Sequence, residues 1–414
     1  MPTAPQADTT SSAALALLSA AAVRQRAHEM LGFGLADALP HFHIDLTRLP
    51  ATADFVASII KTNYPDLKVP LHSRWRHFRF GSHDAWLELA GRKPWKDAAA
   101  KARAAFDLAI VSVLLDAGAG ERWKYRDTAT GTVAGRSEGL ALASLRMFES
   151  GLFSSDPTDP LRVDAARLVS LTGQHLARGF GANSDNPLPT LDGRAALLAR
   201  LGRALLDQPN VFAQRDAARP GGLFDVLAKQ KTTPAAAILE ALLIHLGSIW
   251  TGRLTLNDVP LGDTWRHRSI RRTDETNGLV PLHKLSQWLA YSLIEPLRDA
   301  GVTVTDIDGL TGLAEYRNGG LFIDSGVVVP HDPDTISRPW PVDGEPIVEW
   351  RALTVALLDR IAPLVIERLG MPPGSMPLGS VLEGGTWAAG RAIAKQKRPD
   401  GRPPLTIVSD GTVF

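Results

Sequence analysis

The sequence predicts a mainly helical protein with a few short strands. Apolar residues recur at helical spacing over several long segments, whereas β-branched runs are few and short. The composition, 44% hydrophobic and 21% charged, is that of a globular protein. A chain of 414 residues suffices for one large domain or two ordinary ones. We therefore expect one large helical unit over residues 21–414, or two closely packed lobes at about 21–250 and 251–414.

Helical patterning covers most of the N-terminal half. Residues 1–20 start with a Pro/Thr/Ser-rich stretch and are expected to form a disordered tail, although a first apolar helix is predicted from residue 13 to 35. Residues 70–95 are dense in His, Arg and Trp and are expected to be loop-like. Further helices are predicted for residues 52–62, 97–115, 140–150, 164–180, 193–206 and 234–246.

The C-terminal half contains the two best-patterned helices, residues 280–297 and 347–369. In the first, Lys284 and Trp288 share a polar–aromatic stripe beside a leucine stripe. Residues 322–329 are short and β-branched, which predicts a strand or hairpin arm. The last ten residues predict a strand and an Asp-Gly turn.

Charge and composition exclude several classes of protein. A formal net charge of +1 favours neither nucleic acid nor an acidic membrane surface as a partner. The chain has no cysteine, so disulfides and thiolate metal sites are excluded. No apolar run reaches the roughly 20 residues that span a bilayer. A signal peptide has a Lys or Arg before its apolar stretch, and residues 13–23 have none before them. We therefore expect a cytoplasmic protein.

The strongest chemical signal lies within residues 308–320. Glu315, Tyr316, Arg317 and Asn318 stand side by side between glycine-rich flanks. Glycine permits tight turns, and a carboxylate in such a turn can be aimed at a ligand. Glu315 is therefore the first candidate for a catalytic group. The alternative is a helix end or hairpin with a local Glu315–Arg317 ion pair.

Other charged residues could assist a catalytic carboxylate. Asp116 stands where an apolar helix meets a glycine turn, and Lys284 lies on the helix that precedes Glu315. Glu349 with Arg351, and Glu383, are also available. Such a set suits a reaction in which an acid stabilises a sugar-like cation while cations hold a phosphate. Each member taken singly could instead form a structural ion pair.

Three other chemistries have weaker support. His41 and His43 are two residues apart, so on a strand both imidazoles would point to one side, as in some metal-dependent hydrolases. Such a site could be completed by His72, His77, His83 or Asp263. Ser137 lies in a Gly-x-Ser-x-Gly pattern, but the residues before it are polar, so a helix cap is the better interpretation. The pair Gly118-x-Gly120 lacks the remaining spacing of a nucleotide-binding loop.

Long motifs resemble those of the uracil catabolism protein four family, which is found in fungi and bacteria. The matching segments are residues 113–120, 136–140, 153–156, 280–293, 310–321, 348–354, 382–391 and 409–414. The resemblance covers nearly the whole chain from about Ala22. It implies a role in the route that opens the uracil ring on ribose phosphate, which yields a ribosylurea-type intermediate and finally urea.

A fainter resemblance concerns the reaction. Lys284-x-x-Gln287, then Glu315-Tyr316-Arg317, then Val348-Glu349-x-Arg351 is similar to the order of motifs in queuosine-salvage nucleotide N-glycosylases. This resemblance implies a DNA-glycosylase-like helical core. It places the catalytic acid at Glu315, where that family has an Asp, and matches Lys284 to its helix lysine. The segment at residues 136–139 departs from that family, so the resemblance does not say which residues form the pocket for the leaving group.

Together these observations predict an N-glycosidic hydrolase that releases urea from a ribosylurea-type intermediate, free or phosphorylated. Glu315 and Lys284 are the predicted catalytic residues. The predicted substrate-binding residues are Arg317, Asn318, Asp116, Trp288, Tyr316, Glu349, Arg351, Arg136 and Glu138. The chemistry requires no metal or organic cofactor, and the expected partners are the small nucleoside- or nucleotide-derived substrate and other pyrimidine-degradation enzymes. The alternatives are a metal-dependent amidohydrolase built on His41 and His43, and a non-catalytic carrier or scaffold.

Overall fold

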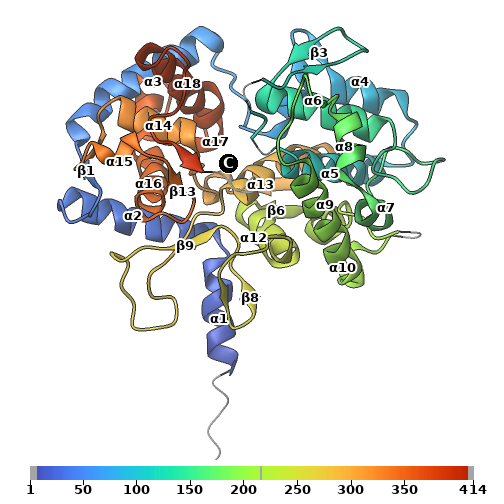
Figure 1. Cartoon of the computed structure of the whole chain (residues 1–414), viewed down its shortest axis with the longest axis horizontal. Coiled ribbons are helices and arrows are strands. Elements are labelled where there is room, and N and C mark those ends of the chain that lie inside the picture. The colour runs from blue at the N-terminus through green and yellow to red at the C-terminus, as the bar shows by residue number, and fades with distance from the viewer. Residues whose placement is uncertain (1–6, 117, 121, 215–216, 409–414) are drawn as a thin grey trace, which may run out of the picture. The chain divides into compact units, whose positions relative to one another are not determined.

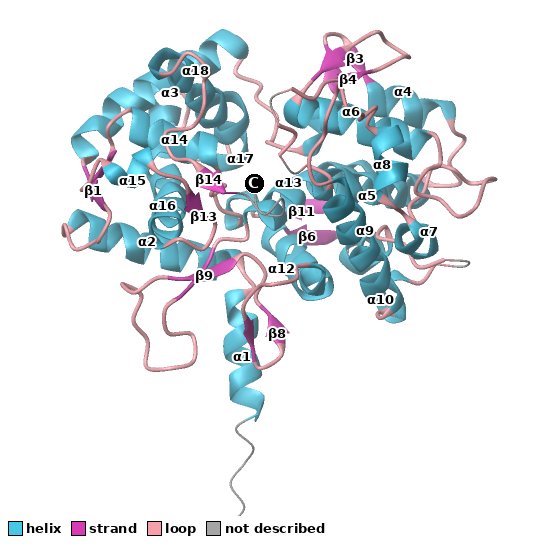
Figure 2. Cartoon of the chain, in the orientation of Figure 1, coloured by secondary structure: helices cyan, strands magenta, loops and turns pink. Residues whose placement is uncertain are grey.

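The computed structural model describes residues 7–116, 118–120, 122–214 and 217–408. These residues are mainly helical, and each of their sheets contains two short strands (Figures 1 and 2). The predicted fold class is confirmed, whereas a DNA-glycosylase-like core stays a prediction. Within the described ranges, no helix combines the length and the apolar character needed to cross a membrane.

The chain divides into two compact units. Unit 1 consists of the described residues within 7–72, 252–287 and 306–408. Unit 2 consists of the described residues within 73–251 and 288–305. The expected single unit, or pair of lobes at about 21–250 and 251–414, stays a prediction. Within unit 1, two helices of residues 20–63 pack on the longest C-terminal helix.

Unit 1 is built mostly of helices. Its helices are α1 Ala7–Leu17, α2 Ala20–Leu35, η1 Leu46–Arg48, α3 Leu49–Asn63, η4 Ile307–Gly309, α14 Tyr316–Asp324, α15 Asp334–Ser337, α16 Glu345–Arg368, α17 Leu378–Val381, the π-helical turn η5 Leu382–Thr386 and α18 Trp387–Lys397. Its strands are β1 Phe42–Ile44, β7 Thr255–Leu256, β8 Val259–Pro260, β9 Thr264–Arg266, β10 Leu279–Pro281, β12 Val328–Pro330, β13 Trp340–Pro341 and β14 Ile407–Val408. The helix α13, Lys284–Asp299, begins in unit 1 and continues in unit 2.

The centre of unit 1 is α16, whose residues from Pro346 to Leu358 are all buried. It packs against α2, α3 and α14 (Figure 1). Each fully buried Leu or Ile contributes about 1.5–3 kcal/mol to the hydrophobic stabilisation of such a core. On α2, Arg24 and His28 bind Asp359 of α16 at 2.9 and 2.8 Å, so the two helices are also joined by charge.

The strands of unit 1 join segments that lie far apart in the sequence. The strands β1 and β12 pair antiparallel with Phe42 opposite Pro330, and β9 pairs antiparallel with β10. The parallel pair β13–β14 joins the two strands nearest the C-terminal end of the described chain. The pair β9–β10 directly precedes α13 and thereby sets where that helix starts.

Unit 2 is organised around α5. Its helices are η2 Arg74–Phe78, α4 Ala85–Arg92, α5 Ala98–Leu114, α6 Arg136–Glu149, α7 Ala165–Ser170, α8 Gly173–Gly179, α9 Leu191–Leu206, α10 Pro209–Phe212, α11 Gly222–Leu227, α12 Ala235–Leu246, η3 Gly247–Ile249 and most of α13. Its strands are β2 Arg79–Phe80, β3 His83–Asp84, β4 Tyr125–Arg126, β5 Val133–Ala134, β6 Thr232–Pro234 and β11 Thr303–Thr305. Every residue of α5 from Ala104 to Leu114 is buried, and α5 contacts α6, α9 and α11.

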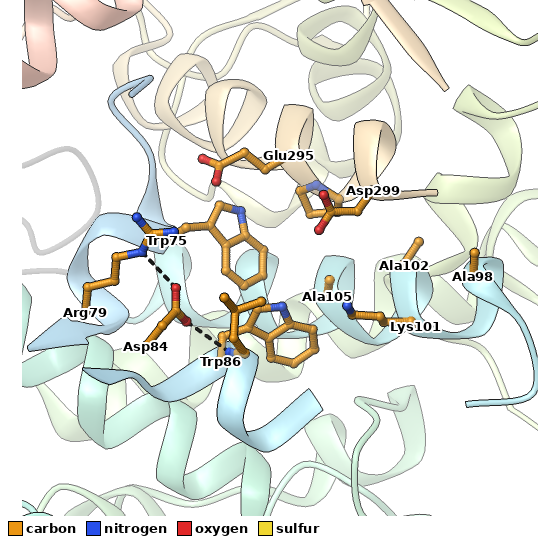
Figure 3. A pocket seen from close by; sticks show the side chains of 12 residues that line it. Trp75, Arg79, Asp84, Trp86, Ala98, Lys101, Ala102, Ala105, Glu295 and Asp299 are labelled. Atoms are coloured by element: carbon orange, nitrogen blue, oxygen red, sulfur yellow. Dashed lines mark hydrogen bonds and ion pairs between the residues drawn. The ribbon is translucent and has the colours of Figure 1, made fainter. Parts of the chain in front are cut away.

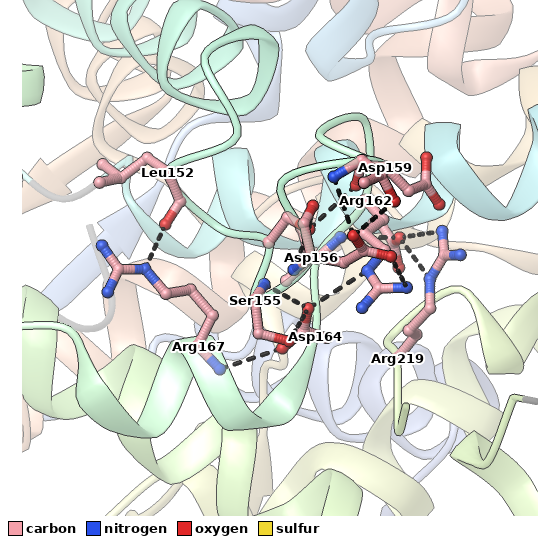
Figure 4. Close-up of polar contacts among 12 residues, drawn as sticks. Leu152, Ser155, Asp156, Asp159, Arg162, Asp164, Arg167 and Arg219 are labelled. Atoms are coloured by element: carbon pink, nitrogen blue, oxygen red, sulfur yellow. Dashed lines mark hydrogen bonds and ion pairs between the residues drawn. The ribbon is translucent and has the colours of Figure 1, made fainter. Parts of the chain in front are cut away.

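A buried polar network supports α7 in unit 2 (Figure 4). Asp164 caps α7, because one carboxylate oxygen accepts the Arg167 backbone N–H at 3.0 Å. The other oxygen accepts both the backbone N–H and the hydroxyl of Ser155 at 2.7 and 2.9 Å. Arg162 donates to the same oxygen at 3.3 Å. Because each buried charge has partners, the loop between α6 and α7 can be ordered without a large hydrophobic core of its own.

The segment around Glu315 differs from the prediction. Residues 316–324 form the helix α14, and only Val328–Pro330 is a strand. Gly319 therefore lies inside a helix, where a Cβ atom would stand 2.7 Å from the Trp350 ring. The glycines that suggest a turn in the sequence instead permit close packing of α14. The alternative considered for Glu315, a helix end, is the observed structure.

The N-terminal region and residues 70–95 also differ in part. The helix α1 occupies much of the expected tail, because Ala14 and Leu17 pack with Leu261 and Leu279, and residues 1–6 lie outside the described residues. The stretch expected to be loop-like contains η2, the β2–β3 hairpin and α4. The expected Asp-Gly turn near the C-terminus also lies outside the described residues.

Replacement of Gly390 by alanine should destabilise unit 1. A Cβ atom there would lie 2.1 Å from the Arg317 carbonyl oxygen, so α18 would have to move away from α14. We expect a loss of about 1–3 kcal/mol in the free energy of unfolding, measured by urea denaturation. Gly32→Ala on α2 is the matched control, because nothing lies within 4 Å of its Cβ position, and it should be neutral or stabilising. Equal effects of the two substitutions would contradict the close approach.

Candidate functional site

Glu315 is the residue that precedes α14, and its side chain caps that helix. One carboxylate oxygen accepts the Arg317 backbone N–H at 2.7 Å, and the other accepts the Asn318 backbone N–H at 2.6 Å. The residue is only 6% exposed. The N-terminus of a helix carries partial positive charge, so it holds a carboxylate in a fixed position.

The surroundings of Glu315 act on its protonation in opposite directions. Burial raises its pKa above the ordinary value, because the charged form loses water. The charge of Lys284, the two backbone N–H groups and the charge of His72 act to lower it. The net direction is upward. A buried carboxyl group with a raised pKa can exchange protons closer to neutral pH than an ordinary glutamate.

Lys284 is the first residue of α13, and that helix start is tightly held. Asp263 accepts the Lys284 backbone N–H at 2.9 Å, and its backbone carbonyl accepts the Leu282 and His283 N–H groups. His283 has a φ of 46°, which is strained for a residue other than glycine. Such strain persists only where surrounding contacts impose it, so the position of Lys284 is well determined.

Arg351 connects the two helix starts that carry Glu315 and Lys284. Two of its nitrogens bind the Asp263 carboxylate at 2.9 and 2.7 Å, and Nε donates to the Ala314 carbonyl at 3.1 Å. Burial alone would raise the pKa of Asp263, but the charge and hydrogen bonds of Arg351 hold that pKa well below its usual range. Arg351 is only 1% exposed, and its contacts position both helix starts. Its role as a direct substrate ligand stays a prediction.

The neighbours of Glu315 on α14 also have protein partners. Arg317 donates to the Gly401 carbonyl at 2.8 Å, and its guanidinium lies 4.9 Å from the Tyr316 ring centre. Asn318 is fully buried, accepts the Thr386 hydroxyl at 2.8 Å and donates to the Leu313 carbonyl at 3.3 Å. These contacts join α14 to the turn η5 before α18 and to Gly401 after it. Substrate binding by Tyr316, Arg317 and Asn318 stays a prediction.

Glu349 lies in the interior of unit 1. One oxygen accepts the backbone N–H groups of Phe42 and His41 at 2.9 and 3.3 Å. The other oxygen lies 3.0 Å from the His267 imidazole, and both side chains are fully buried. Glu349 thus joins α16 to β1 and to His267, the residue after β9, which explains a charged residue at this position without a ligand. Its predicted contact with substrate is untested.

Two residues near Glu315 are not among those predicted for the site. His72 lies close enough for its charge to act on Glu315, and its Nδ1 is 2.6 Å from Oε2 of Glu383. Glu383 belongs to the turn η5, and the His72 ring lies 6.0 Å from that of Trp387. The sequence signal was present, since Glu383 and Trp387 both fall in the motif at residues 382–391.

The remaining predicted residues lie in unit 2. Asp116 binds the fully buried Arg74 at 3.2 Å, and its Oδ1 atom is buried without a hydrogen-bond partner in the described part of the chain. The Arg74 guanidinium lies 5.5 Å from the Trp288 ring centre, and the charge of Glu138 acts on it. Arg136 is exposed at the start of α6. An unsatisfied carboxylate oxygen can accept an N–H or O–H of a ligand.

The histidines considered for a metal have other neighbours. His41 lies 3.3 Å from Glu345, and the exposed His43 lies 3.0 Å from Asp37. Over the described ranges, no group of three or more His, Asp or Glu side chains could hold a metal ion.

Each unit has a cavity apart from these residues. In unit 1 a cavity of about 650 Å³ lies beside the C-terminal half of α16 and residues 371–378. In unit 2 a cavity of about 230 Å³ is walled by Trp75 and Trp86, with Glu295 and Asp299 on α13 facing it (Figure 3). None of the predicted site residues is among the described residues that line these two cavities.

Comparison with known proteins shows relatives that match nearly the whole chain. Residues 16–414 match the family described as "Protein of unknown function (DUF1688)". The chain is 40% identical to Protein urg3 of Schizosaccharomyces pombe over 408 residues, which cover 96% of this chain and 98% of that protein. It is 38% identical to Uracil catabolism protein 4 of Lachancea kluyveri over 412 residues, which cover 90% of this chain and 92% of that protein. The family predicted from the motifs is thus confirmed.

Replacement of Asp263 by asparagine tests the support of the two helix starts. The change removes a buried charge partner of Arg351, so we expect a loss of about 3–5 kcal/mol in the free energy of unfolding at pH 7. Because the folded-state pKa of Asp263 is lowered, its stabilisation is present above the unfolded-state pKa of aspartate and is lost as the pH falls. The difference between wild type and variant should therefore shrink below about pH 4.

The matched control is Asp54→Asn, which removes an ion pair with Arg368 in which the Asp54 side chain is 64% exposed. Exposed pairs contribute about 0–1 kcal/mol, so this variant should unfold almost as wild type does. Urea denaturation of both variants at several pH values gives the measurement. A cost for Asp263→Asn that equals the control, or that is independent of pH, would show that the buried pair does not support the fold.

Proposed function

The chain belongs to the DUF1688 family, and we propose on that premise that it acts in pyrimidine breakdown as an N-glycosidic hydrolase. The substrate is a ribosylurea-type intermediate, free or phosphorylated, and the products are urea and ribose or ribose phosphate. The name of one relative, Uracil catabolism protein 4, supports the pathway. The buried carboxylate of Glu315, held by two backbone N–H groups beside the charges of Lys284 and His72, supports the reaction.

The proposed reaction breaks the bond between C1 of the sugar and the ureido nitrogen. The sugar ring then carries positive charge, which a fixed carboxylate stabilises without rearrangement. Glu315 faces this charge, orients a water molecule and accepts its proton as the oxygen adds to C1. The upward direction of the Glu315 pKa suits this role, because a stronger base accepts the proton more readily.

Lys284 has an electrostatic role in this proposal. Its charge keeps Glu315 more ionised than burial alone would allow, since it lowers the pKa that burial raises. In a phosphorylated substrate the same ammonium group would also attract the phosphate. Arg351 keeps Lys284 and Glu315 in place through Asp263 and Ala314.

The reaction can be tested directly with purified protein treated with a chelator. Ribosylurea and its phosphate ester are supplied separately, and urea and free sugar are measured together. Equal amounts of the two products are expected, and the better substrate reveals the phosphorylation state that is used. Ammonia without urea would instead indicate an amidohydrolase, and binding without any product would indicate a carrier.

Replacement of Glu315 by glutamine should reduce kcat by about 10²–10⁴-fold, as removal of a catalytic acid–base group usually does. Glutamine has nearly the same shape and keeps one of the two acceptors for the α14 N–H groups, and the loss of the other costs about 1 kcal/mol. Circular dichroism should show that the fold persists. Glu367→Gln, at a side chain that is 73% exposed on α16, is the control and should leave kcat unchanged. Full activity of the Glu315 variant would refute its catalytic role.

Replacement of Lys284 by methionine should displace the acid side of the pH profile. Loss of its charge raises the pKa of Glu315 further, so the acid limb of kcat/KM should move to higher pH. The profile is measured from pH 4 to 9 with the substrate that wild type prefers. An unmoved acid limb, or one displaced to lower pH, would mean that Lys284 does not act on the ionisation of Glu315.

A further inference from the structure

His72 and Glu383 form a nearly buried pair in unit 1, and the turn that carries Glu383 is joined to α14 by the hydrogen bond from Thr386 to Asn318. Their contact, Nδ1 to Oε2, measures 2.6 Å, and the two side chains are 6% and 16% exposed. The His72 backbone N–H donates to the Gly379 carbonyl at 2.9 Å, so the main chain is held as well. A hydrogen bond to one imidazole nitrogen determines which nitrogen carries the exchangeable proton at the opposite edge of the ring.

The position of Glu383 is set by an unusual piece of backbone. It belongs to η5, a π-helical turn, which is a feature often found at functional sites. Gly384 and Gly385 allow this turn to lie directly against its neighbours, because Cβ atoms there would stand 2.7 Å from side-chain carbons of Val69 and Val56. The turn therefore cannot shift without loss of packing, and Glu383 presents its carboxylate to His72 from a fixed place.

The proposed reaction needs an acid as well as a base. Urea is a very poor leaving group as an anion, so its nitrogen must gain a proton as the bond to the sugar breaks. Glu315 cannot supply that proton while it accepts one from water. Two side chains, Lys284 and His72, act on Glu315 through their charges, and of these His72 carries an imidazole, the side chain that most often serves as a general acid.

We propose that His72 is the general acid that protonates the leaving ureido nitrogen, and that Glu383 is the residue that positions it. This role rests on the function proposed above. As the C1–N bond breaks, its electron pair stays on nitrogen, which takes the proton from Nε2 of His72. Water adds to C1 and its proton passes to Glu315. His72 ends neutral and Glu315 ends protonated, so the return of one proton restores both groups and the products are urea and the sugar.

Charged groups on η5, α14, α13 and α18 lie in the same unit as His72. Glu383 contacts it from η5, and Glu315 lies nearby at the start of α14. Lys284 acts on Glu315 from α13. Arg391 of α18 lies 4.8 Å from the centre of the Trp387 ring, which in turn faces the His72 ring.

The test uses full-length His72→Asn, whose amide N–H can still reach Glu383 but has no proton to transfer. We expect kcat/KM for the preferred ribosylurea substrate to fall by about 10²–10⁴-fold. Wild type should lose activity on the alkaline side as the imidazolium loses its proton, and the variant should have no such alkaline limb. The acid limb from Glu315 should remain in both proteins.

Glu383 is tested by its effect on the same profile. Glu383→Gln should move the alkaline limb to lower pH, because an amide does not stabilise the imidazolium, and Glu383→Asp should restore part of the shift. A purely structural role would lower activity without moving the limb. Glu367→Gln again is the control and should keep the wild-type profile.

The outcomes separate this proposal from the function on which it rests. If wild type releases urea and His72→Asn is nearly as active, or if the variant keeps an alkaline limb, the role of His72 is overturned and the proposed function stands. An alkaline limb that Glu383→Gln leaves in place would overturn the positioning role of Glu383. Wild type that releases no urea from either substrate would overturn the proposed function, and this proposal with it.

Discussion

The arrangement of unit 1 depends on the buried guanidinium of Arg351. From α16 it binds the Asp263 carboxylate, which holds the start of α13, and the Ala314 carbonyl, which precedes the start of α14. A guanidinium has five donors in a rigid plane, so one side chain can fix two backbone segments at once. Lys284 and Glu315 stand at those two helix starts, and their relative position follows from this one residue.

The same physical constraint explains why so many charges are buried in this protein. A buried charge is tolerated only where hydrogen bonds or an opposite charge replace its water. Glu349, Asp263 and Asp164 meet that condition with backbone N–H groups, and each also has a buried His or Arg beside it. Glu315 is likewise held by two backbone N–H groups, and burial raises its pKa.

Sequence patterns predicted most of the helices but misjudged the segment on which the site is built. The apolar spacing of residues 347–369 identifies α16, because burial of one face is a local property of the chain. Gly319 and Gly320 suggest a turn, yet they lie within α14, where the Trp350 ring packs against Gly319 and the Pro404 ring against Gly320. A contact of this kind involves two segments and cannot be recognised from one of them.

The sequence alone determined the helical class, the family and the residue types available for chemistry, since spacing and motifs are properties of the chain itself. Only the tertiary structure decided what each charge does. It brings Lys284, His72 and Glu383 to the neighbourhood of Glu315, and it gives Arg351 and Glu349, equally prominent in the motifs, buried partners that join helices. Ionisation depends on burial and on charges from distant segments, so it is decided only when the chain has folded.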